Sequence, residues 1–296
     1  MTVWNTRSQR TEAADYRYAI TKLQNSDYFR ATELIADYYL KLGEEENYLK
    51  IRQANLKNEK QYIELANYWL KKGEQKKYIA TLEAGVTYLL KECREPQVGF
   101  DFLRAAAKPS VLLQSLADYY ELKGECENLC RILMAIAEYS GVTFDLYQQI
   151  KNTCALAKQW QQLQPKLLTL AARNSEVLAQ IYLAQADWVA ALQLARQQPD
   201  DERLQVLVAE GIKEYHPREA IEIYEQLVER YIKLQSRDTP TESLCDRYRT
   251  AARHATAIKS IYLSILKEPD IWQQYIDNLR QRYSRYRALQ EEFRRL

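Results

Sequence analysis

The sequence has 296 residues, of which 47% are hydrophobic and 28% charged, and this apolar content excludes a disordered chain because it is enough to bury a core. The formal net charge of +2 excludes a strong long-range attraction of the whole molecule to polyanions. No stretch reaches the roughly 20 apolar residues that a membrane helix needs, and the first residues lack the apolar core of a signal peptide, so we expect a soluble, cytoplasmic protein.

The composition also favours helices over strands. Glycine and proline occur only seven times each, tyrosine occurs 23 times, and leucine and glutamine are far more frequent than valine, which is common in strands. We therefore predict an all-α protein. The cysteines are odd in number and irregularly spaced, which suits free thiols in a reducing cytoplasm better than a set of disulfides. They are Cys93, Cys126, Cys130, Cys154 and Cys245.

The first predicted elements come from a phrase that occurs three times. It reads "ADYYLKLG" at 36–43, "ANYWLKKG" at 66–73 and "ADYYELKG" at 117–124. Each phrase ends in a glycine, which adopts the left-handed backbone of a helix end without steric cost. We therefore predict turns at Gly43, Gly73 and Gly124, each joining two helices of a unit of about 30 residues, which is the period of helical solenoids.

These units are expected to stack into one array. The second helix of each unit carries apolar residues at helical spacing, and a single hairpin leaves that stripe uncovered. Degenerate copies follow in "LAQIYLAQADW", where Ala186 replaces the glycine, and around Ala209. The prediction is a right-handed α-solenoid of stacked helix-turn-helix, tetratricopeptide-like repeats over residues 1–235, irregular near 93–110.

Two aromatic residues follow the alanine of each phrase by two and three positions. Adjacent residues on a helix point about 100° apart, so one of each pair can pack inward while the other reaches a groove. Packing explains such residues by itself, but partly exposed aromatic side chains also dominate many protein interfaces. The candidate partner-binding residues are Tyr38, Tyr39, Tyr68, Trp69, Tyr119 and Tyr120.

No pattern in the chain predicts an active site, a metal centre or a cofactor. Cys126 and Cys130 share a helix face but supply two ligands where zinc needs four, so we interpret them as buried thiols. Cys245 and His254 lie nine residues apart without a visible third group to orient a base. His216 precedes a proline, which suits the entry of a helix, and no glycine-rich phosphate loop occurs.

The last predicted segment, residues 236–296, either continues or caps the array. From residue 246 onward it holds eleven lysines or arginines against six acids. Apolar residues three or four apart from Leu279 to Leu296 predict one face of a capping helix. The alternative is contact with nucleic acid, because arginines bind phosphates and aromatic rings stack on bases. The candidate residues for that contact are Arg280, Arg282, Arg285, Arg287, Tyr283 and Tyr286.

Three stretches resemble a known family. "YHPREAIEIYEQLVERYI" at 215–232, "IKSIYLSIL" at 258–266 and "RYRALQEEFRRL" at 285–296 are similar to the helical C-terminal region of bacterial SWIM zinc-finger proteins. That family carries a C-x-C and C-x-H zinc motif, which is absent here, and the only histidines are His216 and His254. The resemblance implies a scaffold role near DNA-remodelling ATPases, and it assigns no metal ligand to this chain.

The expected function is therefore a non-enzymatic, monomeric helical-repeat scaffold that mediates protein-protein interaction with a partner the sequence does not identify. The alternative is an accessory nucleic-acid-associated module that uses the basic C-terminal segment and is linked to a DNA-remodelling ATPase. Neither function involves a membrane.

Overall fold

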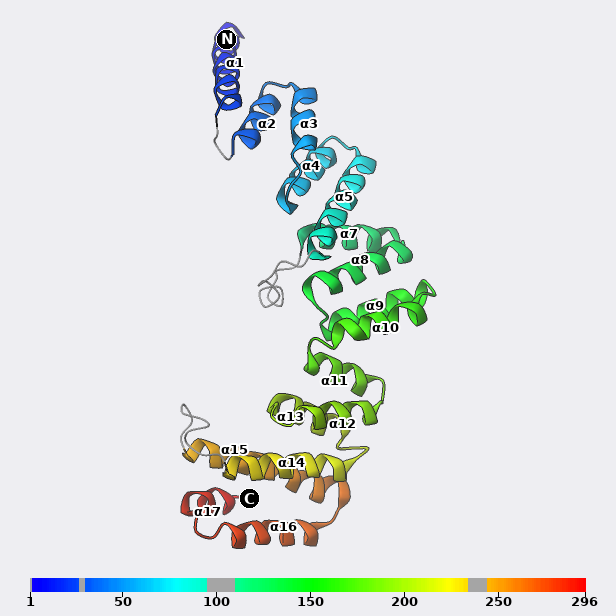
Figure 1. Ribbon diagram of the computed structural model, residues 1–296, viewed down its shortest axis with the longest axis vertical. Coiled ribbons are helices and arrows are strands. Elements are labelled where there is room, and N and C mark those ends of the chain that lie inside the picture. Colours follow the sequence, from blue (N-terminus) through cyan, green and yellow to red (C-terminus); the bar gives the residue numbers. More distant parts are fainter. Residues whose placement is uncertain (1, 27–29, 95–109, 234–243) are drawn as a thin grey trace. The chain divides into compact units, whose positions relative to one another are not determined.

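The computed structural model describes residues 2–26, 30–94, 110–233 and 244–296 (Figure 1). Across these ranges every regular element is helical, with 16 α-helices, one π-helix and no strand, which confirms the all-α prediction. None of the helices described is both long and apolar enough to pass through a bilayer. By their internal contacts, the residues divide into two compact units.

Unit 1 comprises Met1–Gly141 and Asn152–Trp160. Its helices pack on their neighbours in sequence: α1 on α2, α2 on α3, α4 on α5, and α7 on both α5 and α8. The bounds are α1 Thr2–Gln24, α2 Ala31–Lys41, α3 Glu45–Ala54, α4 Glu59–Lys71, α5 Gln75–Arg94, α7 Val111–Lys123 and α8 Cys126–Ser140. The predicted irregular segment near 93–110 falls mostly on residues 95–109, outside the described ranges.

Unit 2 comprises Val142–Lys151 and Gln161–Leu296. Here α11 packs on α12 and α13, α13 on α14, α14 on α15, and α15 on α17. The division between the units falls within α9, whose residues 152–156 belong to unit 1. The bounds are α9 Phe144–Leu156, α10 Trp160–Ala171, α11 Ser175–Ala184, α12 Trp188–Gln197, α13 Glu202–Ile212, α14 Pro217–Lys233, α15 Leu244–Ser260, the π-helix η1 Ile261–Leu266, α16 Pro269–Arg282 and α17 Arg287–Phe293. The predicted boundary at 235 lies in residues 234–243, outside the described ranges.

The phrase glycines form one type of turn. Gly43, Gly73 and Gly124 have left-handed backbone, with φ of +75°, +75° and +68°. In the first turn the N–H of Gly43 donates to the carbonyl of Leu40 at 3.1 Å, and the N–H of Glu44 donates to that of Tyr39 at 2.9 Å. The other two turns repeat this pair of bonds. This Schellman arrangement satisfies carbonyls that the helix end leaves unpaired.

Two residues other than glycine form the same turn. Ala186 follows α11 with φ of +57°, and Lys158 follows α9 with φ of +59°. The N–H of Asp187 donates to the carbonyl of Tyr182 at 2.9 Å, which reproduces the bond made by Glu44. This turn therefore also forms without glycine.

The predicted single apolar face of the terminal helix is wrong, because the chain turns between α16 and α17. The amide of Gln290 donates to the carbonyls of Arg280 and Tyr283, both at 3.1 Å, so the carbonyls at the break are paired. The guanidinium of Arg280 donates to the carbonyl of Phe293 at 2.7 Å. Phe293 is buried, whereas Tyr286, within the break, is exposed.

The expectation of free thiols is wrong for two cysteines. Cys130 of α8 and Cys154 of α9, both in unit 1, form a disulfide with their Cα atoms 5.6 Å apart. Both are buried. They are 24 residues apart in sequence, and only the packing of the helices brings them together. Cys126 and Cys245 are free thiols.

Candidate functional site

The phrase aromatics fall into two groups, and the first group is structural. Tyr68 and Tyr120 are buried, and their hydroxyls donate to carboxylates of neighbouring helices, to Glu45 at 3.0 Å and to Glu83 at 2.6 Å. Burial and the adjacent carboxylate raise the pKa of each tyrosine to about 12. These two side chains hold helices of unit 1 together and are not available to a partner.

The second group consists of Tyr38, Tyr39, Trp69 and Tyr119, whose side chains are partly exposed. Tyr38 stacks on Tyr16 of α1, with ring centroids 5.2 Å apart. Three of the four rings also have a lysine ammonium above them: Lys41 lies 5.8 Å from the centroid of Tyr38, Lys77 lies 4.6 Å from Trp69, and Lys123 lies 5.9 Å from Tyr119. Each of these rings thus combines an apolar surface with a nearby positive charge.

Sequence reasoning missed the partners of the buried tyrosines, and the same pairing occurs in unit 2. The hydroxyls of Tyr224, Tyr231 and Tyr283 donate to glutamates. The paired residues are 14 to 54 positions apart, so no local spacing signals them. A high tyrosine content together with abundant glutamate is the only hint in the sequence.

Glu202 collects three donors in unit 2. Its carboxylate accepts hydrogen bonds from the hydroxyl of Tyr231 and from the guanidinium of Arg253, the latter at 3.2 Å. It also lies 3.0 Å from Nε2 of His254. His254 is only 3% exposed, and burial lowers its pKa. Cys245 lies nine residues earlier on α15, about 13 Å along the helix, and is exposed. The structure therefore does not bring the candidate nucleophile and base together.

His216 and Cys130, which were also considered for chemistry, take part in contacts that support the fold. The carbonyl of His216 accepts the N–H of Ala220 at 3.1 Å at the start of α14, and its Nδ1 lies 3.6 Å from Glu219. Cys130 is tied into the disulfide, apart from Cys126. In the described ranges, no group of three or more histidine, cysteine, aspartate or glutamate side chains is placed to hold a metal ion.

The basic C-terminal candidates separate into paired and unpaired arginines. Arg282 binds Glu229 at 2.9 Å, and Arg280 binds Asp277 as well as the end of α17. Arg285 and Arg287 are exposed and form no ion pair with any residue that the structure describes. Tyr286, which is 46% exposed, lies between them.

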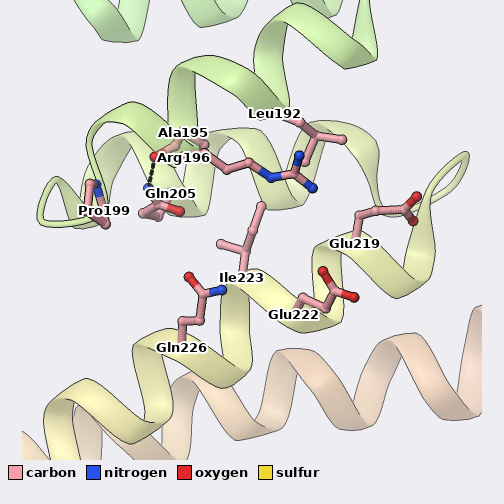
Figure 2. Close-up of a pocket in the computed structure, with 9 residues that line it drawn as sticks. All are labelled: Leu192, Ala195, Arg196, Pro199, Gln205, Glu219, Glu222, Ile223 and Gln226. Carbon is pink, nitrogen blue, oxygen red and sulfur yellow. Dashed lines mark hydrogen bonds between the residues drawn. The ribbon is translucent and has the colours of Figure 1, made fainter.

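A cavity of about 260 Å³ lies between α14 and the α12–α13 pair (Figure 2). Arg196 of α12 projects over Ile223, and the carboxylates of Glu219 and Glu222 extend from α14. Gln205 is held by a hydrogen bond of 2.6 Å to the carbonyl of Ala195. The lining residues are Leu192, Ala195, Arg196, Pro199, Gln205, Glu219, Glu222, Ile223 and Gln226. A second cavity, of about 360 Å³, lies between α14 and α16.

Comparisons with known proteins give no identification. A scan against protein-family models found no match, and a search of curated proteins found none.

Proposed function

We propose that this chain is a non-enzymatic scaffold, a right-handed α-solenoid of tetratricopeptide-like repeats, which binds a protein partner along the first helices of its units. In this proposal the protein is monomeric and cytoplasmic. The resemblance to the helical region of SWIM zinc-finger proteins is consistent with a scaffold role.

One observation carries the proposal. Tyr38, Trp69 and Tyr119 each follow the alanine of a phrase, Tyr38 and Tyr119 by two residues and Trp69 by three, so each of three first helices carries a partly exposed ring. The neighbouring Tyr68 and Tyr120 are buried and bonded to carboxylates. Aromatic side chains supply large contact areas with few rotatable bonds and are frequent hot spots in interfaces. Because such rings recur on several hairpins of unit 1, they suit an elongated partner segment that contacts several hairpins at once.

The test compares two variants of the tagged protein. The first replaces Tyr38, Trp69 and Tyr119 with serine and leaves the buried Tyr68 and Tyr120 intact. The second replaces Tyr215, an exposed aromatic of unit 2 that is 68% exposed, with serine. Affinity capture from the source cell's lysate after nuclease treatment, followed by mass spectrometry, identifies the bound proteins.

We expect the triple variant to lose the partner and the Tyr215 variant to retain it. Circular dichroism melting curves must first show that the triple variant is folded. A folded triple variant that captures the same partner to the same extent would defeat the proposal.

A second candidate function rests on the segment Arg285, Tyr286 and Arg287. Two exposed arginines, which pair with no carboxylate in the described part of the chain, flank an exposed ring. This combination suits phosphate contact and base stacking. In this candidate function the segment binds single-stranded nucleic acid, in an accessory module linked to a DNA-remodelling ATPase.

Salt dependence tests this second candidate. We expect binding of a fluorescent single-stranded oligonucleotide to weaken steeply with salt and to disappear on changing Arg285 and Arg287 to glutamate. A charge-matched control changes Arg173 and Arg203, which are also exposed. Equal losses in both double variants would indicate only a general charge effect, and unmeasurable binding by the unmodified protein would reject the candidate.

A further inference from the structure

The second cavity of unit 2 contains a carboxylate that has no partner among the residues that the structure describes. The cavity lies between α14 and α16 and has a volume of about 360 Å³. Its lining combines acids, bases, an amide and an aromatic ring. These residues are Glu225, Glu229, Lys233, Tyr275, Asn278, Leu279 and Arg282.

The charges on one side of this cavity are already paired. Glu229 accepts from Lys233 at 2.6 Å, Arg282 at 2.9 Å and the hydroxyl of Tyr283 at 2.6 Å. Burial by itself would raise the pKa of Glu229, but these three donors, two of them cationic, outweigh burial and hold the pKa below its usual value. Lys233 and Arg282 are therefore both paired with Glu229, and neither forms an ion pair with Glu225.

Glu225 lies one turn earlier on α14, and its carboxylate is not paired in this way. It forms no hydrogen bond or ion pair with any residue in the described ranges. Burial raises its pKa, and the carboxylates of Glu222 and Glu229 raise it further. Tyr275, from the opposite wall, likewise lacks a hydrogen bond to the described residues.

We propose that this cavity binds an alkylammonium or guanidinium group, which pairs with the carboxylate of Glu225 and lies against the ring of Tyr275. Partly buried carboxylates without a partner are unfavourable, and a cation with hydrogen-bond donors supplies both the charge and the bonds that are missing. An aromatic ring beside the carboxylate adds attraction for a cation. The chemistry is shared by a small free amine and by a lysine or arginine side chain of a partner.

Two probes distinguish these sources. Agmatine represents a free amine, and a tripeptide of glycine, arginine and glycine with blocked ends represents a partner side chain. Each is titrated into the full chain, and binding is followed by NMR of the methyl groups of Leu279, which lines the cavity. Tighter binding of the tripeptide assigns the site to a partner chain, and tighter or equal binding of agmatine assigns it to a small amine.

The decisive variant is Glu225→Gln, which keeps the shape of the side chain and removes its charge. We expect it to weaken binding of the better probe by about tenfold or more, which corresponds to the loss of one charged hydrogen bond. The control is Glu291→Gln, because Glu291 is exposed on α17 and outside the cavity. This control is expected to bind like the unmodified protein.

The thermal midpoint provides a readout that separates binding from packing. If Glu225 serves only to stabilise the fold, its replacement lowers the midpoint, whereas removal of an unmatched carboxylate leaves the midpoint unchanged or raises it. The proposal is overturned if neither probe perturbs Leu279, if Glu225→Gln binds as well as the unmodified chain, or if Glu291→Gln weakens binding equally.

Discussion

His254 illustrates how burial decides the behaviour of a single titratable residue in this fold. Its side chain is almost inaccessible, and its ring is packed near Tyr224 and Tyr231, with centroids 6.0 and 5.7 Å away. Burial lowers its pKa even though Glu202 favours the charged form. At neutral pH the neutral ring therefore uses its Nε2–H to donate to Glu202.

This arrangement predicts a pH dependence of stability. The folded state binds the proton of His254 less readily than the unfolded state does, so the free energy of unfolding should fall as the pH drops below about 6.5. The free energy of unfolding should fall by no more than about 1.4 kcal/mol for each pH unit. Urea unfolding between pH 7.5 and 5 measures it.

The variant His254→Gln keeps a donor toward Glu202 and removes the titration. We expect its stability to vary less with pH over this range, whereas His216→Gln, at the half-exposed start of α14, should retain the dependence of the unmodified protein. A His254→Gln variant with an unchanged slope would contradict this account.

At the scale of elements, the residue at the left-handed position of each turn affects the free energy of unfolding. A non-glycine residue in this conformation costs about 1 kcal/mol, partly offset because glycine loses more freedom on folding. The Cβ position of Gly124 has no neighbouring atom within 4 Å, so only the backbone is at issue there.

The turn therefore predicts changes of opposite sign. Ala186→Gly should raise the free energy of unfolding by about 0.5 to 1 kcal/mol, and Gly124→Ala should lower it by about as much. A matched control is Ala184→Gly at the last residue of α11. Ala184 does not have the left-handed backbone of Ala186, so glycine relieves no strain there and should lower the free energy of unfolding, because it loses more freedom on folding. Denaturant unfolding of the three variants decides the matter. Stabilisation by both Ala→Gly changes would exclude the turn as the cause.

Much of the hairpin pattern was predictable because it depends on residues that are close together in the sequence. Glycine seven residues after a buried alanine identifies a helix end, and Ala36, Ala66 and Ala117 are indeed in the core. The bonds from Tyr68 to Glu45 and from Tyr120 to Glu83 were not predictable, since their partners depend on how separate helices pack. For the same reason, spacing did not reveal the cavity around Glu225.

The terminal segment shows where helical periodicity misleads. Leu279, Tyr283, Leu289 and Phe293 are buried, as a single apolar face requires, but they belong to two helices. The break is stabilised by the side chain of Gln290 acting on carbonyls seven and ten residues earlier. Helical periodicity predicts which side chains are buried. It does not predict where a side chain takes the place of a backbone donor in a hydrogen bond and lets the helix end.

At the scale of the whole molecule, the disulfide acts on one of the two units. Cys130 and Cys154 both belong to unit 1 and close a loop of 24 residues. Reduction should lower the free energy of unfolding of this unit by about 3 kcal/mol in the chain-entropy account. Hydrogen exchange by mass spectrometry should show lost protection in α7 and α8 and unchanged protection in α13 to α15.

The free cysteine Cys126 provides the control for reduction. A Cys126→Ser variant should keep full protection under oxidising conditions, whereas Cys130→Ser should reproduce the effect of reductant. Equal protection with and without reductant would show that the covalent bond contributes nothing to the stability of unit 1.

The turns at Lys158 and Ala186 also limit how far glycine can be used to recognise such hairpins in a sequence. Both turns form the backbone bonds of the glycine turns without a glycine, and a cost of about 1 kcal/mol is small against the stability of a domain. Glycine is therefore a clear mark of a hairpin where it occurs, but a hairpin of the same construction can lack it. A search that relies on the glycine alone would miss the helices that these two turns join.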